Sequence, residues 1–213
     1  NRITFRAMIP LFIEALTKRL RRDLPGKSAQ RKMMITPNRF PTENQENEGI
    51  PASILLLLYP LEGKWFFFLT KRSQNVEHHK GQISFPGGVV EKNESKMNAA
   101  IRETNEEIGV DKDLIKIIGS LTPFYIPVSN FHISPYVGWT EEKPHTKVQD
   151  AEVKRVFSVS INDLVLEKNL KTKKDFFSNK SFKVPYFDLN GETVWGATSM
   201  ILSEFKFILR NMK

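Results

Sequence analysis

Apolar side chains occur in two kinds of run along this chain, and each kind predicts a different element. Ser53–Tyr59 and Trp65–Thr70 are short and dense in leucine, aromatic and β-branched residues, which favours strands. The Pro60–Lys64 segment between them is typical of a hairpin turn. Further short runs predict strands over residues 114–122, 131–139, 153–157 and 182–188.

In the second kind of run, apolar side chains recur at the spacing of a helix. Met8, Phe12, Leu16 and Leu20 recur every four residues, which predicts an amphipathic helix over residues 8–22 that stops before Pro25-Gly26. A second helix is expected over 95–108. Two later helices are expected, a short one over 160–166 and a longer one over 196–210.

The order of these elements predicts an α+β fold with a mixed sheet and helices on its faces. Residues 37–49 are polar and rich in turn formers, so we expect a surface loop there, and residues 71–88 are loop-like as well. The chain therefore divides into a helix and loop extension over residues 1–49 and one compact domain over residues 50–213.

The amino-acid composition limits the cross-links and metal sites that the chain can form. The chain has 213 residues and no cysteine, which excludes disulfides and thiolate metal sites. Any metal must be held by oxygen or nitrogen ligands, and a cysteine-free chain suits a reducing compartment, so we expect a cytoplasmic protein. No apolar run is long enough to span a bilayer, and we expect neither a signal peptide nor a membrane partner.

The net charge of +8 suggests an anionic partner. The densest basic runs, at residues 18–22 and 171–174, are not interleaved with aromatic residues as in a single-strand binder. We interpret them as a solvated basic surface and expect no nucleic acid; an anionic lipid or a phosphorylated metabolite would also suit the charge.

The helix expected over 95–108 carries an acidic cluster that is out of character for a basic chain. At about 100° per residue, one stripe can bury against a sheet, and it consists of Met97, Ile101, Thr104 and Ile108. Glu103, Glu106 and Glu107 fall together on another sector. Such a cluster most commonly marks a solvated face, because like charges one turn apart repel.

Two features favour a metal site instead. The surrounding chain is basic, and Phe85-Pro86-Gly87-Gly88 precedes the helix as a loop whose backbone can approach a ligand closely. Carboxylate oxygens with loop carbonyls suit a hard cation, Mg²⁺ or Mn²⁺.

The same residues resemble the Nudix box, G-x5-E-x7-R-E-U-x-E-E-x-G-U, where U is apolar. The matching residues are Gly88, Glu94, Arg102, Glu103, Glu106, Glu107, Gly109 and Val110. Thr104 departs from the pattern in an apolar slot, where its methyl group can still pack. The resemblance implies a Nudix-like α/β/α sandwich and metal-dependent hydrolysis of a pyrophosphate bond.

The resemblance also implies roles. Glu103, Glu106 and Glu107 would bind the divalent cations, helped by the Gly87 carbonyl, and Arg102 would orient the glutamates. Glu94 would be more structural than catalytic, as a cap or a surface ion pair. Gly109 would end the helix.

A second signature lies upstream. The segment from Leu69 to Gly88 is similar to the motif of coenzyme A pyrophosphatases, L-L-T-x-R-S-x3-R-x3-G-x3-F-P-G-G. The matching residues are Leu69, Thr70, Arg72, Ser73, Gly81, Phe85, Pro86, Gly87 and Gly88. Glu77 departs from it, in the slot of the second arginine. The resemblance implies that the substrate contacts Arg72, Lys71, Ser73, Phe85 and Gly88.

We therefore expect hydrolysis of coenzyme A or its derivatives to adenosine 3′,5′-bisphosphate and 4′-phosphopantetheine, by a monomer or a homodimer. The general base stays open among Glu103, Asp150 and Glu152. Two alternatives also stay open. One is a Nudix hydrolase of another nucleoside diphosphate derivative, such as ADP-ribose, and the other is a non-catalytic nucleotide-binding module.

Overall fold

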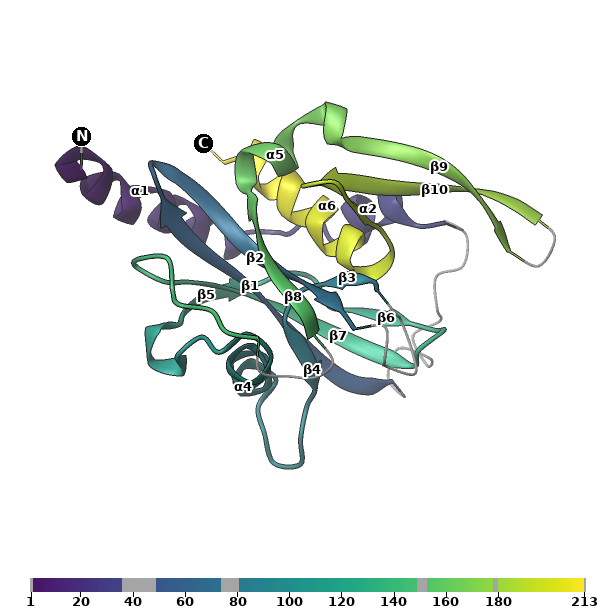
Figure 1. Ribbon diagram of the computed structural model, residues 1–213, viewed down its shortest axis with the longest axis horizontal. Helices are drawn as coiled ribbons and strands as arrows, with labels where there is room; N and C mark the ends of the chain where they lie inside the picture. The colour runs from purple at the N-terminus through teal and green to yellow at the C-terminus, as the bar shows by residue number, and fades with distance from the viewer. Residues whose placement is uncertain (1, 36–48, 74–80, 149–152, 178–179, 213) are drawn as a thin grey trace.

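The computed structural model describes residues 2–35, 49–73, 81–148, 153–177 and 180–212 (Figure 1). The described helices are α1 Arg2–Leu20, α2 Lys27–Gln30, α4 Lys96–Ile108, α5 Ile161–Val165 and α6 Gly196–Arg210. The strands of the main sheet are β1 Ile50–Leu61, β2 Lys64–Arg72, β3 Ile83–Ser84, β4 Gly87–Val89, β5 Lys116–Ser120, β6 Phe124–Ile126, β7 Phe131–Trp139 and β8 Val153–Ser160. A smaller sheet holds β9 Leu170–Phe177, β10 Lys180–Leu189 and β11 Glu192–Val194.

The main sheet is mixed. β1 runs parallel to β7, whereas β1 and β2 form the antiparallel hairpin that the sequence predicts. Glu62 and Gly63 turn this hairpin with φ of 49° and 78°, a conformation in which glycine is favoured. β5 and β6 pair with β7, and β8 pairs with the far edge of β2.

β1 and β2 pair only near their shared turn, and the space farther along is filled by the segment that follows β2. β4 pairs with β1 through residues 52–54, and β3 pairs with β2 through Thr70 and Lys71. The loop expected over 71–88 therefore contains two short strands. That expectation was wrong in part, because a glycine-rich run can still complete a sheet when two neighbouring strands diverge.

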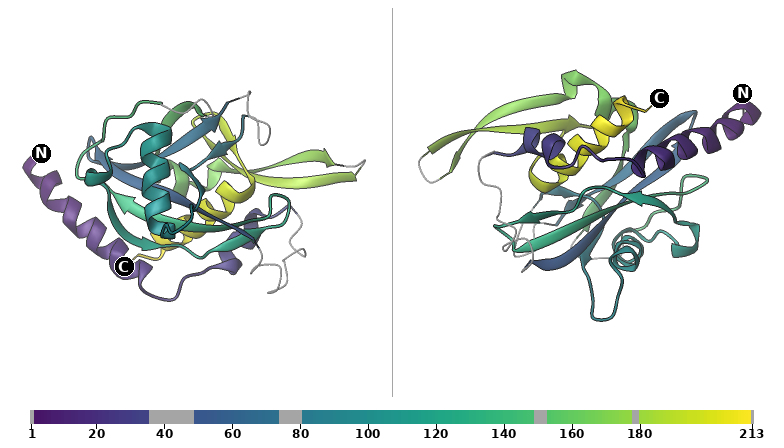
Figure 2. Two further views of the ribbon diagram at one scale, coloured as in Figure 1. Left: turned by 90° about the horizontal axis from the view of Figure 1, so that it is seen from below. Right: turned by 180° about the vertical axis from the view of Figure 1, so that it is seen from behind.

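Helices cover both faces of the main sheet. Along β1, Leu55, Leu57 and Tyr59 belong to the core under α4, and Leu56 and Leu58 belong to the core on the other face. Side chains that alternate in a strand and are buried on both sides explain the unbroken apolar run in this segment. Figure 2 shows α4 on one side of the sheet and α6 on the other, so the α+β sandwich with a mixed sheet is confirmed.

The N-terminal segment packs into the same core as α6. Leu16, Leu20 and Met33 are buried with Phe205 and Ile208 of α6. The helix expected over 8–22 is longer at its start, beginning at Arg2. Most of the loop expected over 37–49 lies outside the described residues.

The sheet of β9, β10 and β11 is the main element that the sequence pattern missed. It projects from the side of the molecule that carries α6, as the green strands in Figure 1 show. Only residues 182–188 were expected as a strand here, because β9 is rich in lysine. The turn between β10 and β11 is Asn190-Gly191, with φ of 54° and 76°, and this dipeptide is a strong hairpin signal.

Candidate active site

Capping groups fix both ends of α4. The Ser95 side chain accepts a hydrogen bond from the Asn98 N–H at 3.1 Å, as a helix N-cap does. At the other end Gly109 has φ of 71°, and its N–H donates to the Asn105 carbonyl at 2.9 Å. The expected helix end at Gly109 is confirmed, and the caps leave little freedom in where the glutamates lie.

The face of α4 that packs on the sheet differs from the expected stripe. Its buried residues are Ala99, Ala100, Thr104, Glu107 and Ile108. Met97 is 40% exposed, because the two small alanines, and not the methionine, approach the sheet. Thr104 is buried, and its hydroxyl donates to the Ala100 carbonyl at 2.7 Å. A hydroxyl in an apolar slot is tolerated because its own helix satisfies it.

Arg102 is the centre of the acidic cluster. Its guanidinium donates two hydrogen bonds to the Glu94 carboxylate, at 2.9 and 3.0 Å. Nη1 donates to Glu103 at 2.8 Å and to Glu106 at 2.9 Å. Nη2 also donates to the Val89 carbonyl at 3.0 Å. One arginine thus joins the helix, the segment before it and β4, with the paired geometry that a guanidinium offers to carboxylates.

The electrostatics of the cluster differ from one glutamate to the next. The hydrogen bond from Arg102 lowers the pKa of Glu94. Burial raises the pKa of Glu103, more strongly than Arg102 lowers it, and the charges of Glu106 and Glu94 add to the rise. The carboxylates also raise the pKa of Arg102, which stays charged. A cation bound beside Glu103 would favour the charged form of this carboxyl group and so oppose the rise in its pKa.

Two glycines let β4 lie against both the sheet and the helix. A Cβ on Gly88 would lie 2.5 Å from the Glu103 carboxylate, which only a glycine permits without movement. A Cβ on Gly87 would lie 2.3 Å from the Ser53 carbonyl oxygen of β1. The loop backbone and the Glu103 carboxylate are therefore in direct contact.

These residues suit a hard divalent cation by the chemistry of their donors. Glu103, Glu106 and Glu107 offer carboxylate oxygens, and Gly87 and Gly88 bring the loop backbone close. The side chains do not converge as expected, however. Among the described residues no three Asp, Glu or His side chains gather into an ion-holding group. Glu103 and Glu106 turn toward Arg102, and Glu107 is 5% exposed.

Three of the five residues expected at the substrate lie at the end of β2, whereas Gly88 lies in β4 and Phe85 just before it. Lys71 and Arg72 end β2, Ser73 follows them, and the Arg72 N–H donates to the Gln82 carbonyl at 2.9 Å. The side chain of Phe85 is 2% exposed and packs with Phe67, at 6.1 Å between ring centroids. Phe85 therefore belongs to the core and not to an open surface. Three residues named in the sequence analysis lie outside the described part of the chain. They are Glu77, which departs from the upstream signature, and the candidate general bases Asp150 and Glu152.

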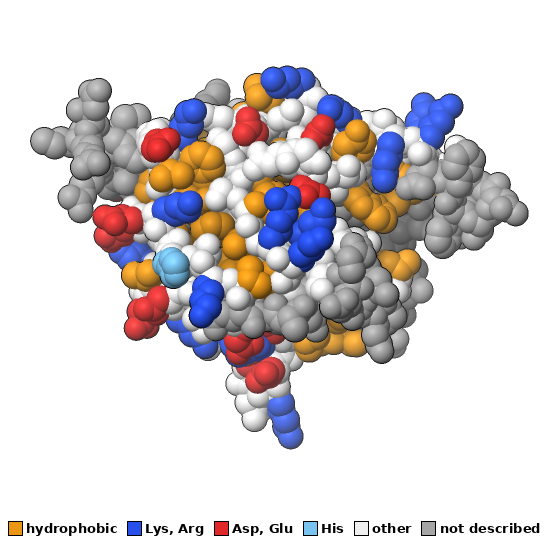
Figure 3. Space-filling model, viewed as in Figure 1, with side chains coloured by type: hydrophobic (Ala, Val, Ile, Leu, Met, Phe, Trp, Pro, Cys, Tyr) orange, Lys and Arg blue, Asp and Glu red, His pale blue; other side chains and the backbone are white. Residues whose placement is uncertain are grey.

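Two charged residues beside Lys71 were not singled out from the sequence. Glu192 accepts hydrogen bonds from Lys71 and from Arg155. Neither residue belongs to a recognisable motif, and 121 positions separate Lys71 from Glu192. The Asn190-Gly191 turn is the one local signal, because it places the start of β11 in a hairpin. Figure 3 shows Lys and Arg side chains gathered near the centre of the face it views.

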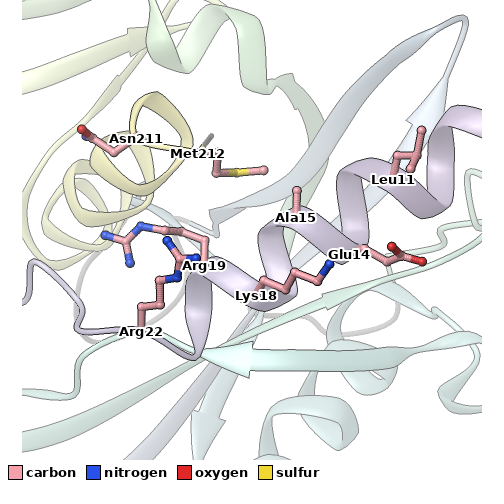
Figure 4. A pocket seen from close by; sticks show the side chains of 8 residues that line it. All are labelled: Leu11, Glu14, Ala15, Lys18, Arg19, Arg22, Asn211 and Met212. Atoms are coloured by element: carbon pink, nitrogen blue, oxygen red, sulfur yellow. The ribbon is translucent and has the colours of Figure 1, made fainter.

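A separate hollow lies between α1 and the C-terminal end of α6 (Figure 4). The residues that line it are Leu11, Glu14, Ala15, Lys18, Arg19, Arg22, Asn211 and Met212. None of them is an expected site residue, and α4 covers the opposite face of the sheet. The basic run at residues 18–22 thus forms part of this wall.

An acidic helix tied by one arginine to a glycine-rich strand, on a mixed α/β/α sandwich, defines a class of hydrolase. The NUDIX domain model matches residues 49–180, more than half of the chain. The chain belongs to the Nudix family, whose hydrolases act on pyrophosphate bonds and generally use divalent metal ions. No helix in the described ranges is long and apolar enough to cross a membrane.

Relatives agree with this assignment. The chain is 30% identical over 201 residues to Nudix hydrolase 3 of Caenorhabditis elegans, covering 84% of each chain. It is 29% identical over 159 residues to Nudix hydrolase 15, mitochondrial, of Arabidopsis thaliana, covering 71% of this chain and 55% of the relative. It thus spans about half of that plant protein. The expected cytoplasmic location stays a prediction, since this relative is named mitochondrial.

The crystal structure of RenU, a Nudix hydrolase from M. smegmatis, has a similar fold. Its TM-score is 0.53 at 14% identity, covering 76% of this chain and 88% of RenU. At this identity the likeness supports the fold alone.

Proposed function

We propose that this Nudix hydrolase cleaves the phosphoanhydride of coenzyme A or its derivatives. The products would be adenosine 3′,5′-bisphosphate and a 4′-phosphopantetheine species. The observation that carries the substrate is the signature from Leu69 to Gly88. This segment leads from the basic end of β2, through β3, to the glycine that touches Glu103. It therefore joins candidate phosphate contacts to the acidic helix. A homodimer stays a prediction.

Glu103, Glu106 and Glu107 would hold Mg²⁺ or Mn²⁺, with the Gly87 carbonyl as a further ligand. When bound, the metal would neutralise the diphosphate and lower the pKa of a water molecule. Arg102 would position the glutamates, because its guanidinium contacts two of them and Glu94. Glu103, Asp150 or Glu152 would take the proton from the attacking water.

Lys71, Arg72 and Ser73 would contact the nucleotide end of the substrate from the end of β2. Gly88 would let the diphosphate approach the backbone, since it carries no side chain. Phe85 would act from the core, by fixing the turn into Gly87 and Gly88.

The test is turnover of a panel of diphosphates with Mg²⁺ or Mn²⁺, with the products identified by mass. We expect a higher kcat/KM for coenzyme A than for ADP-ribose. A ratio below one would overturn the substrate and favour ADP-ribose. No metal-dependent turnover of any diphosphate would instead support a nucleotide-binding module.

A further inference from the structure

Three charged side chains from three distant elements meet beside the end of β2. Lys71 of β2 and Arg155 of β8 are register partners on adjacent strands, and Glu192 begins β11. The Lys71 Nζ lies 3.0 Å from both carboxylate oxygens of Glu192. The Arg155 guanidinium donates to the same carboxylate. Two cations therefore converge on one anionic group.

Lys71 and Arg155 stabilise the negatively charged form of Glu192 at the centre of this cluster. Burial opposes the charge of Glu192, but the hydrogen bonds from Lys71 and Arg155 outweigh it and lower the pKa of this carboxyl. The Glu192 side chain is 16% exposed, whereas that of Arg155 is 48% exposed and reachable from solvent. The Arg155 guanidinium also lies 5.1 Å from the centroid of the Phe157 ring, a contact that favours a fixed position for a cation.

The backbone that carries Glu192 is anchored on both sides. Leu189 and Val194 are fully buried, and the intervening Asn190-Gly191 turn is tight. Ile83, the register partner of Lys71 on β3, accepts a hydrogen bond from the Thr198 hydroxyl of α6 at 2.9 Å. These contacts hold the backbone on either side of Glu192 in place, so a displacement of Glu192 from the cluster would involve its side chain alone.

β3 and β4 link the cluster to the acidic helix along the chain. Gly88, which faces Glu103, follows Ile83 by five positions. A fully extended run of that length spans at most roughly 18 Å, which sets the upper limit on the distance between the Cα atoms of Ile83 and Gly88.

We propose that Lys71 and Arg155 form a subsite for a terminal phosphate monoester of the substrate, and that Glu192 fills this subsite until the phosphate displaces it. A phosphate monoester carries more negative charge than one carboxylate and has three acceptor oxygens, so it competes well for two converging cations. The inference rests on the proposed function, because a 3′-phosphate distinguishes coenzyme A from ADP-ribose. Glu192 would then make the enzyme selective, since a substrate without that phosphate leaves the internal ion pairs intact.

Calorimetric titration of the metal-free protein with adenosine 3′,5′-bisphosphate and with dephospho-coenzyme A, which carries no phosphate monoester, tests the subsite without turnover. Glu192→Gln keeps the shape of the side chain and removes the competing charge. We expect it to bind the bisphosphate about fivefold or more tightly than the wild type does, and Arg155→Gln to bind it about fivefold or more weakly. The affinity for dephospho-coenzyme A should change little in either variant.

Glu141→Gln is the matched control. Glu141 pairs with Lys116 at 2.5 Å near the opposite end of the sheet, and its loss changes the net charge equally. It should leave bisphosphate affinity as in the wild type. Unchanged bisphosphate affinity in Arg155→Gln and in folded Glu192→Gln would overturn the subsite, as would equal changes for dephospho-coenzyme A.

The titrations and the turnover assay can fail separately. Shifted bisphosphate affinities without hydrolysis of coenzyme A would support the subsite and reject the proposed substrate. Hydrolysis of coenzyme A with unshifted bisphosphate affinities would support the proposed substrate and reject the subsite. If Glu192→Gln fails to fold, Arg155→Gln decides alone, because Arg155 is half exposed and its removal leaves the core intact.

Discussion

Arg102 contacts glutamates that are unevenly spaced in the sequence but lie around one guanidinium group in the fold. Glu94 lies before α4 begins, yet its carboxylate pairs with Arg102 as closely as the two helical glutamates do. It also accepts the N–H of Glu91 at 3.1 Å. Its position supports the structural role expected for it, and it can be separated from catalysis by experiment.

Glu94→Gln should lower the free energy of unfolding by about 1 kcal/mol near neutral pH, a value reduced by solvent at this near-surface pair. Arg102 lowers the pKa of Glu94 in the folded state. The stabilisation is therefore fully present above the ordinary carboxyl pKa and is lost as the pH falls through the lowered folded value. Urea unfolding of both proteins across acid pH measures this.

The difference between wild type and Glu94→Gln should thus shrink toward zero at acid pH. A difference that grows as the pH falls would contradict the assignment. Glu91→Gln is the control, because Glu91 is 69% exposed and lies 3.9 Å from Arg102.

Glu107→Gln should lower kcat by orders of magnitude while preserving the shape of a buried side chain. Loss of a charged ligand raises the barrier, and each factor of ten in rate corresponds to about 1.4 kcal/mol. Steady-state kinetics at saturating Mg²⁺ measures it. Near-normal kcat would mean that the metal site is placed wrongly.

At the scale of elements, β4 joins the sheet to α4. Gly87 faces the backbone of β1, and Gly88 faces the flexible end of the Glu103 side chain. Adjacent glycines therefore have different physical reasons to lack a side chain: one permits strand pairing and the other permits contact with a carboxylate.

Gly87→Ala and Gly88→Ala should separate stability from activity. Gly87→Ala should cost about 2 kcal/mol or more of stability, because its Cβ meets a backbone oxygen that cannot move alone. Gly88→Ala should keep most of its stability and lose about tenfold or more in kcat/KM, because Glu103 must swing away. Thermal unfolding and kinetics on both variants test this, and the reverse pattern would refute it.

At the scale of the whole molecule, one buried carboxylate holds the N-terminal segment to the domain. Glu204 of α6 is fully buried and accepts hydrogen bonds from the Gln30 amide at 3.0 Å and the Thr122 hydroxyl at 2.7 Å. The Gly26 N–H donates to it as well, at 3.3 Å. The oxygens of this buried carboxyl group have hydrogen-bond partners, and we therefore expect the segment that holds Gly26 and Gln30 to fold together with the domain.

Leu16→Ala should therefore destabilise the protein by about 3 kcal/mol, as for a leucine removed from a core. Leu16 is fully buried, whereas Leu11 on the same helix is 65% exposed. Leu11→Ala should leave the free energy of unfolding within about 0.5 kcal/mol of wild type. Equal, small effects in urea unfolding would show that α1 is only an extension, as the sequence suggested.

The sequence by itself determined the elements whose pattern is local. The hairpin of β1 and β2, the length of α4 and its end at Gly109 follow from apolar runs, turn residues and a glycine cap, which act over a few residues. The Nudix box was readable for the same reason, because its members lie within about two dozen positions on one short strand and one helix.

Only the tertiary structure decided which distant residues meet. The small Ala99 and Ala100 turned α4 so that Met97 faces solvent, and the divergence of β1 and β2 made strands of a glycine-rich loop. Glu192 reached Lys71 and Arg155 because the β10–β11 hairpin packs beside β3, across separations that no local pattern encodes. Charge pairing and close packing depend on the folded positions of these groups, so the ion cluster at the end of β2 became visible only in the fold.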